Sequence, residues 1–108
     1  MYIAEADDLL LVSVHTDSRL SVVALCGELD CSNTNQIAGV LADVLHGGPA
    51  EIVVDVSALR YIDSLGVAAF VRAQQRAAHA HTAFRVTGAS GMVRRVFELL
   101  EMRSLLEA

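Results

Sequence analysis

The sequence contains no lysine and no tryptophan, and it has one proline and two cysteines among 108 residues. Every basic side chain is therefore an arginine, and the 8 arginines are outnumbered by 13 acidic residues, which gives a net charge of −5. An acidic chain without a basic stripe lacks the positive surface that binds nucleic acid. We therefore expect no nucleic-acid partner.

Long apolar runs and targeting segments are also missing. Residues 1–8 are acidic and lack the basic flank and apolar run of a signal peptide. No apolar segment approaches the roughly 18 residues that span a bilayer. Two cysteines are too few for a disulfide framework. We expect a cytoplasmic protein without a membrane span. Cys26, in an apolar run, is expected to be buried, while a redox pair with Cys31 stays open.

Aliphatic residues dominate what the chain does contain. Hydrophobic residues make up 54% of the sequence but aromatic residues only 5%, so the core must consist mainly of Val, Leu, Ile and Ala. A chain of this length matches one domain, and we predict a single domain over residues 1–108. The apolar composition leaves a weak homodimer open.

The hydrophobic pattern predicts strands and helices in the order β-β-α-β-α-β-α. Strands are expected at 9–15 and 20–26, which form a hairpin, and at 51–56 and 83–87. Helices are expected after the polar run 31–35, from Ser64, and after Ser90. In the second helix the inward face is predicted to be Val67, Phe70, Val71, Gln74 and Ala78. For Leu105–Leu106, a strand and a helical turn stay open.

This order predicts an α/β fold with a mixed, mostly parallel sheet. Strands that alternate with helices form parallel crossovers, and the initial hairpin adds an antiparallel edge. Most of the chemistry lies where the strand ending near Val56 leads into the second helix. There, Asp63 and Ser64 are good helix caps. The start of a helix also tolerates a phosphate, because its free N–H groups favour negative charge.

Two short motifs carry a family resemblance. The segment Ile62-Asp63-Ser64-Leu65-Gly66 is similar to the Asp-Ser-Ser-Gly signature of the STAS family, named for sulphate transporters and anti-sigma-factor antagonists. The segment Gly27-Glu28-Leu29-Asp30 matches the family's tetrad at the end of the second strand. The two motifs keep the family's spacing, so the resemblance covers nearly the whole chain.

The resemblance implies a non-enzymatic, bacterial regulator of transcription of the anti-sigma-factor antagonist type. Its unphosphorylated form would bind an anti-sigma factor with serine kinase activity and release the sigma factor. Phosphorylation of Ser64 would switch binding off, and a PP2C-type phosphatase would reverse it. Carried over, Asp63 flanks the acceptor, Asp30 lies beside it on the docking surface, and Gly66 permits close approach. The alternative is a STAS adaptor of a lipid-transport or stress-signalling complex that lacks a phosphoswitch.

Leu65 departs from the family, which often has a second serine there. We predict that a helical stripe off the inward face forms the docking surface, with Leu65 as its apolar anchor. Its members are Leu65, Ala69, Arg72, Ala73 and Arg76.

Other chemistries have weaker support. A phospho-aspartate receiver would need a lysine and an acidic pair after its first strand, and this chain has no lysine and no such pair after Val14. Asp55 is therefore expected to be structural or to support the following loop. The segment Gly88–Gly91 matches no phosphate-binding loop or nucleophile elbow. His79 and His81 are expected at a helix end rather than at a metal. We therefore expect no catalytic residues, cofactor or metal.

Overall fold

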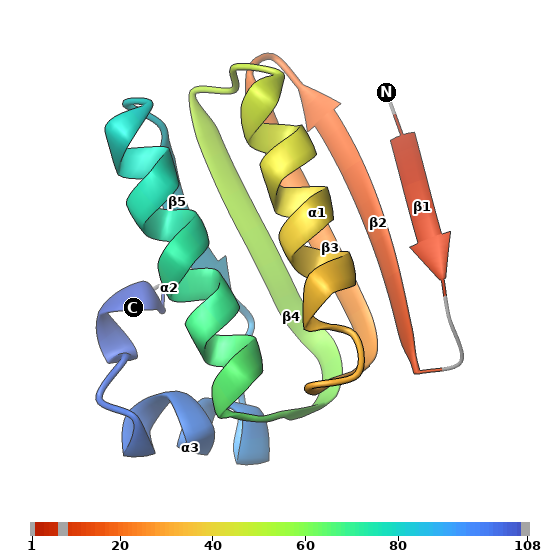
Figure 1. Cartoon of the computed structure of the whole chain (residues 1–108), viewed down its shortest axis with the longest axis vertical. Coiled ribbons are helices and arrows are strands. Elements are labelled where there is room, and N and C mark those ends of the chain that lie inside the picture. Colours follow the sequence, from red (N-terminus) through yellow and green to blue (C-terminus); the bar gives the residue numbers. More distant parts are fainter. Residues whose placement is uncertain (1, 7–8, 107–108) are drawn as a thin grey trace.

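A five-stranded mixed sheet forms the framework of the protein (Figure 1). The computed structural model describes residues 2–6, by their backbone, and residues 9–106. The strands lie side by side in chain order, β1-β2-β3-β4-β5, with β1–β2 and β2–β3 antiparallel and β3–β4 and β4–β5 parallel. The bounds are β1 Tyr2–Ala6, β2 Leu10–Asp17, β3 Leu20–Leu29, α1 Thr34–His46, β4 Glu51–Ile62, α2 Ser64–His79, β5 Ala83–Thr87, α3 Gly91–Leu99 and the 3-10 turn η1 Arg103–Leu105.

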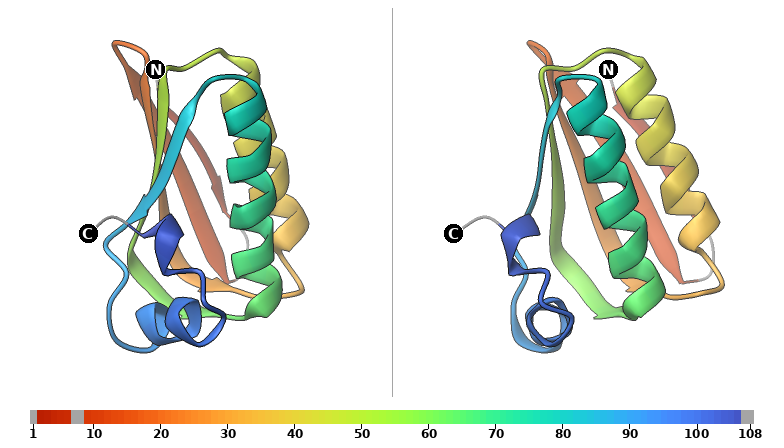
Figure 2. Two further views of the ribbon diagram at one scale, coloured as in Figure 1. Left: turned by 90° about the vertical axis from the view of Figure 1, so that its left-hand side faces the viewer. Right: turned by 60° about the vertical axis from the view of Figure 1, so that its left-hand side comes forward.

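Two helices cover one face of this sheet. Figure 2 shows α1 and α2 side by side against the sheet, with α3 below its lower end. Alternation along β2 places Leu10, Val12 and Val14 in the core while Leu11 stays exposed on the other face. None of the helices among the described residues is long and apolar enough to cross a membrane.

The predicted α/β fold with a mixed sheet is confirmed, and the structure adds three details. An additional strand, β1, which is not among the predicted strands, pairs antiparallel with β2. Residues 1, 7–8 and 107–108 of the predicted domain lie outside the described residues. The hairpin turn is shorter than predicted, because β2 continues to Asp17. Strand β4 runs to Ile62, with two register irregularities against β3.

Cys26 is exposed, so the prediction that it is buried is wrong. Neighbouring side chains of a strand point to opposite faces, and Leu25 takes the inward position. Cys26 therefore lies on the face that α1 and α2 leave uncovered. An apolar run in a central strand does not reveal which of its residues face the helices.

The buried face of α2 is rotated relative to the prediction. Val67 and Phe70 are buried as predicted, but Ala78 is exposed and Ala69 is only 3% exposed. Ala69 therefore cannot belong to an exposed docking stripe. The reason is that α2 packs against α1 as well as the sheet. A narrow crevice between the two helices is lined by Ala38, Leu41, Ala42, Leu45, Ile52, Ala69, Arg72, Ala73, Arg76 and Phe84.

The C-terminal segment combines both alternatives left open by the sequence. Residues Arg103–Leu105 form a 3-10 turn, and Leu106 then makes a single parallel bridge to Val86 of β5. Leu105 is buried in the core. The segment thus closes over the end of β5 and holds α3 close to the sheet.

Gly27 is required by a close approach between β3 and the start of β2. Its φ is +117°, and a Cβ there would lie 2.0 Å from the carbonyl oxygen of Leu9. We expect Gly27→Ala to lower the free energy of unfolding by about 2 kcal/mol or more, because strain in this backbone region alone costs roughly 1–3 kcal/mol. Urea unfolding would measure the loss.

Gly39 provides the matched control for this prediction. It lies in the exposed middle of α1, and a Cβ there would meet nothing within 4 Å. Gly39→Ala should raise stability by about 0.5–1 kcal/mol through helix propensity. Equal effects of the two substitutions would contradict the role assigned to Gly27.

Candidate functional site

The candidate site lies where the parallel strands β3 and β4 end. Leu29 pairs with Ile62 at the last position of both strands, so the residues that follow them, Asp30 and Asp63, start two neighbouring loops at the same edge of the sheet. One loop leads into α1 and the other directly into α2. The two motifs singled out in the sequence therefore meet in space.

Asp63 connects these two loops through its carboxylate. One oxygen, Oδ1, accepts the backbone N–H of Gly66 at 3.0 Å and caps α2. The other, Oδ2, accepts the backbone N–H of Cys31 in the neighbouring loop at 3.2 Å. The Asp63 amide in turn donates to the carbonyl of Leu29 at 3.2 Å. Asp63 therefore holds the site together, in addition to its predicted position beside Ser64.

Asn33 organises the loop between β3 and α1, a role that the sequence did not reveal. Its side chain is buried, with 2% exposure. The amide nitrogen Nδ2 donates to the carbonyl of Glu28 at 2.9 Å, and Oδ1 accepts the N–H of Asp30 at 3.0 Å. Asn33 occupies the N-cap position of α1 but makes no side-chain cap bond. The polar run 31–35 suggested only helix capping.

Asp30 is held in a local turn by Ser32. Its Oδ1 accepts the hydroxyl of Ser32 at 2.5 Å and the backbone N–H of Ser32 at 2.8 Å. The hydroxyl bond, with a smaller contribution from the backbone bond, lowers the pKa of Asp30 below its ordinary value. The site therefore carries a fixed negative charge at Asp30 near neutral pH.

Ser64 is the first residue of α2, and it is exposed. Among the described residues, no hydrogen bond engages its hydroxyl, and the backbone N–H groups of Ser64 and Leu65 have no acceptor. The Leu65 side chain is 50% exposed beside it. The predicted apolar anchor is thus accessible, and Arg72 is exposed two turns further along α2.

Gly66 allows a close approach, but within the domain rather than to a partner. It is buried, and a Cβ there would lie 2.8 Å from Cγ1 of Ile62 and 3.0 Å from Cγ of Leu29. The missing side chain lets the first turn of α2 pack on the ends of β3 and β4. Its predicted place on the docking surface is therefore corrected.

Three further residues singled out in the sequence, Asp55, His79 and His81, lie away from this site. Asp55 accepts the backbone N–H of Ser57 at 2.9 Å through Oδ1, so it supports the chain that follows the centre of β4. His79 and His81 lie exposed at the end of α2. Within residues 9–106, no three His, Cys, Asp or Glu side chains gather where they could hold a metal ion.

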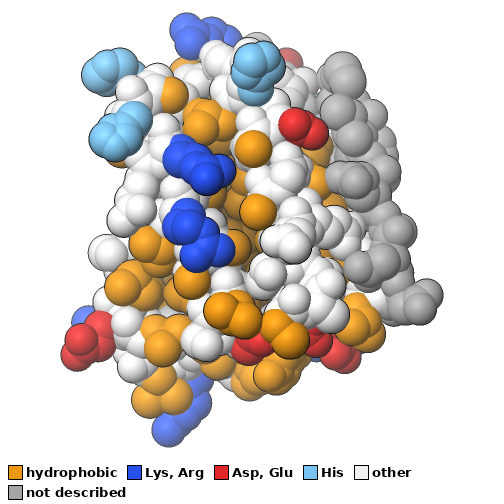
Figure 3. Space-filling model, viewed as in Figure 1, with side chains coloured by type: hydrophobic (Ala, Val, Ile, Leu, Met, Phe, Trp, Pro, Cys, Tyr) orange, Lys and Arg blue, Asp and Glu red, His pale blue; other side chains and the backbone are white. Residues whose placement is uncertain are grey.

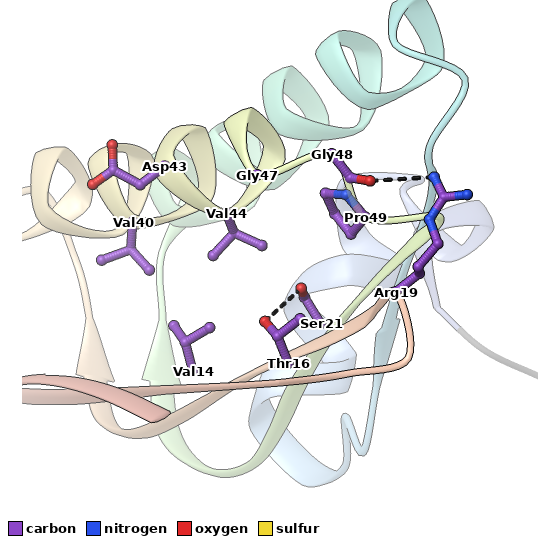
Figure 4. Close-up of a pocket in the computed structure, with 10 residues that line it drawn as sticks. All are labelled: Val14, Thr16, Arg19, Ser21, Val40, Asp43, Val44, Gly47, Gly48 and Pro49. Atoms are coloured by element: carbon purple, nitrogen blue, oxygen red, sulfur yellow. Dashed lines mark hydrogen bonds between the residues drawn. The ribbon is translucent and has the colours of Figure 1, made fainter. Parts of the chain in front are cut away.

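A hollow of about 350 Å³ lies at the opposite end of the sheet, between α1 and the β2–β3 hairpin (Figure 4). The hydroxyl and guanidinium groups that line it are engaged within the protein, whereas the carboxylate of Asp43, which also lines it, points away from them. The hydroxyls of Thr16 and Ser21 lie 2.9 Å apart, and the Arg19 guanidinium donates to the carbonyl of Gly48 at 3.3 Å. Val14, Val40 and Val44 line the rest. The hollow brings no nucleophile together with a base.

Comparison with known proteins identifies the fold. The family model described as "Mlab, STAS domain" matches residues 12–107. Among solved structures, an anti-sigma factor antagonist from Mycobacterium paratuberculosis superimposes with a TM-score of 0.83 and 23% identity, over 94% of this chain and 86% of that chain. None of the curated proteins matches the chain in sequence.

Two further structures show the same fold in two chemical states. The anti-sigma factor antagonist SpoIIAA in its unphosphorylated form gives a TM-score of 0.79 and 21% identity, over 89% of this chain and 85% of that chain. The Bacillus cell fate determinant SpoIIAA in the phosphorylated form gives 0.70 and 20%, over 89% and 88%. At these identities the likeness concerns the fold.

We predict that Asp63→Ala lowers the free energy of unfolding by about 0.5–2 kcal/mol, the usual cost of losing a helix cap. The substitution also leaves the N–H of Cys31 without its acceptor. Ser90→Ala is the matched control, because Ser90 occupies the N-cap of α3 without a side-chain cap bond. Chemical denaturation should show little change for Ser90→Ala. Equal losses would contradict the bridging role of Asp63.

We also predict that Ser32→Ala raises the pKa of Asp30, since it removes the hydroxyl that stabilises the carboxylate. A group whose pKa is lowered by folding stabilises the fold above its unfolded pKa, and this contribution disappears as the pH falls through the folded pKa. The wild type should therefore lose more stability on acidification than the variant. Carboxyl NMR titration measures the pKa, with Ser104→Ala as control. An unchanged Asp30 pKa in Ser32→Ala would disprove the assignment.

Proposed function

The chain belongs to the STAS domain family, as the match over residues 12–107 shows, and we propose that it is an anti-sigma-factor antagonist switched by phosphorylation of Ser64. The family consists of regulatory binding domains, and the chain is not an enzyme. In this proposal, residues 1–108 act as one cytoplasmic domain. The unphosphorylated form binds an anti-sigma factor with serine kinase activity, and a PP2C-type phosphatase restores that form after phosphorylation.

The free hydroxyl of Ser64 is the observation that carries this proposal. It is exposed and makes no hydrogen bond to a described residue, so a kinase can modify it without breaking a contact of the fold. The free N–H groups of Ser64 and Leu65 can donate hydrogen bonds to a phosphate at the start of α2. Asp63 keeps the helix capped throughout. The modified domain therefore stays folded and changes only its surface.

The surface around Ser64 explains why a phosphate would release a partner. Phosphorylation adds a charge of about −1.5 to −2 beside the carboxylates of Asp63 and Asp30 and next to the exposed Leu65. Burying an unpaired charge in an interface costs about 3–5 kcal/mol. At about 1.4 kcal/mol per tenfold change, the affinity falls by roughly two to three and a half powers of ten. No change of fold is needed.

The second candidate is a STAS adaptor that needs no phosphoswitch. The matching family model is named for Mlab rather than for an antagonist, and this favours keeping the adaptor as the alternative. An adaptor would bind its complex independently of the charge at position 64. The two functions therefore differ in one measurable property, the response of binding to modification of Ser64.

The test begins with purified anti-sigma factors of the serine kinase type from the same organism. Each is incubated with the chain and ATP, and mass spectrometry maps the phosphate. We expect one kinase to modify Ser64 and to bind the unmodified chain. Ser64→Ala should retain binding, while Ser64→Asp should weaken it at least tenfold in calorimetry.

Ser90→Asp is the matched control, because Ser90 is an exposed serine at the start of another helix, α3. It should leave the affinity within about twofold, a difference below 0.5 kcal/mol. Equal affinities of Ser64→Asp and Ser64→Ala would refute the charge switch and favour the adaptor.

A further inference from the structure

An apolar groove lies directly beside Ser64, on the side of α2 that faces α3. It has a volume of about 350 Å³, and Ser64 itself forms part of its wall. Figure 3 shows hydrophobic side chains gathered over α3 and the beginning of α2. The groove is lined by Ser64, Val67, Ala68, Val71, Arg72, Leu100 and Met102.

The wall of the groove opposite α2 is formed by Leu100 and Met102. The packing of α3 and the turn at its end position these two residues. Phe70 of α2 and Phe97 of α3 are both fully buried, and their rings are stacked with centroids 6.3 Å apart. At the end of α3 the N–H of Met102 donates to the carbonyl of Phe97, and the N–H of Glu101 donates to that of Glu98. These two bonds form a Schellman motif, with Glu101 in the left-handed region at φ 59°. The resulting turn holds Leu100 and Met102 against α2.

The lining is apolar apart from Ser64 and one cation. Val67 forms a buried part of the wall, whereas Leu100 remains 38% exposed. Arg72 is the single charged residue that lines the groove. Within the described part of the chain, its guanidinium makes no ion pair or hydrogen bond. The groove thus combines an uncovered apolar wall with an unpaired positive charge at its rim.

We propose that this groove receives an amphipathic segment of the anti-sigma kinase. A Leu, Ile, Met or Phe side chain of that segment packs between α2 and Leu100, and an Asp or Glu side chain pairs with Arg72. Charge complementarity selects this partner chemistry, since the groove offers one cation and no acidic side chain. The proposal rests on the function proposed above and assigns the docking site that Ser64 controls.

The position of Ser64 links the groove to the switch. A phosphate on Ser64 would stand in the wall of the groove, close to the acidic side chain that Arg72 attracts. It would repel that side chain. It would also hold water at a surface that must be desolvated when the partner binds. Docking therefore uses α3 as well as α2, and Arg72 is the one member of the predicted stripe that lines this groove.

Two pairs of variants test the groove, with the kinase that modifies Ser64 as the probe. Leu100→Ala should weaken binding at least fivefold, whereas Leu99→Ala should change it less than twofold, because Leu99 is exposed but does not line the groove. Arg72→Glu should weaken binding more than tenfold. Arg76→Glu, one turn further along, should weaken it several times less. Calorimetry measures each affinity, and circular dichroism confirms that each variant is folded.

Two methionines allow contact between the kinase and the groove to be detected directly. Met102 lines the groove, while Met92 lies 44% exposed on α3 outside it. In a chain labelled at the methionine methyl groups, adding the kinase should shift or broaden the Met102 signal and leave the Met92 signal in place. This readout does not depend on any substitution.

The outcomes separate the groove from the function it rests on. If no kinase modifies Ser64 or binds the wild-type chain, the proposed function and the groove are both refuted. If Ser64→Asp abolishes binding but Leu100→Ala and Arg72→Glu bind like wild type, the groove alone is refuted. Unchanged Met102 and Met92 signals in the complex would likewise refute the groove. Loss of binding in both groove variants, with a selective Met102 response, supports it.

Discussion

The parallel pairing of β3 with β4 is the constraint on which the site depends. These strands are separated in sequence by α1, and only their pairing in register brings the ends Leu29 and Ile62 together. Asp30 and Asp63 then start adjacent loops, and the Asp63 carboxylate can reach both α2 and the neighbouring loop. A one-residue slip would reverse the faces of every side chain in the strand and separate these partners.

The polar groups at this edge divide into those that hold the structure and those that stay free. Three side chains hydrogen-bond to the backbone or to Ser32, namely those of Asp63, Asp30 and Asn33. Ser64 makes no such bond to a described residue. This arrangement supports the proposed switch, because a charge added at Ser64 would meet side chains that already hydrogen-bond to other groups. In the short motif Asp63-Ser64, the first residue thus stabilises the fold and the second leaves its hydroxyl free.

The sequence was most informative where a local pattern determines the structure. The strand and helix order, the exposed Leu65 and the cap at Asp63 follow from short-range rules of periodicity and capping. The role of Asn33 could not be derived in this way, because its partners, Glu28 and Asp30, are chosen by the path of the loop. Its type alone is equally consistent with an ordinary helix cap.

The wrong predictions concern small or apolar residues whose type fits either face of their strand or helix. Cys26 and Leu25 are both compatible with burial, and only the placement of α1 and α2 on one face decides between them. Ala69 fits a surface stripe as well as a helix interface, and the packing of α1 against α2 resolved it. In the turn that positions Leu100, Glu101 adopts the left-handed conformation, which is usually occupied by glycine. The residue type at this position therefore does not predict the turn.

The crossover between β3 and β4 also has a kinetic consequence. Strands β2 and β3 are joined by a two-residue turn, Ser18 and Arg19, and hairpins of this kind form within about 1–10 μs. Strands β3 and β4 are instead separated in the chain by the whole of α1, and non-local pairings of this kind form more slowly. During synthesis the hairpin emerges before β4 exists. Asp63 can meet the loop after β3 only when this later pairing is complete, so the bond that joins the N–H of Cys31 to the Asp63 carboxylate forms late in folding.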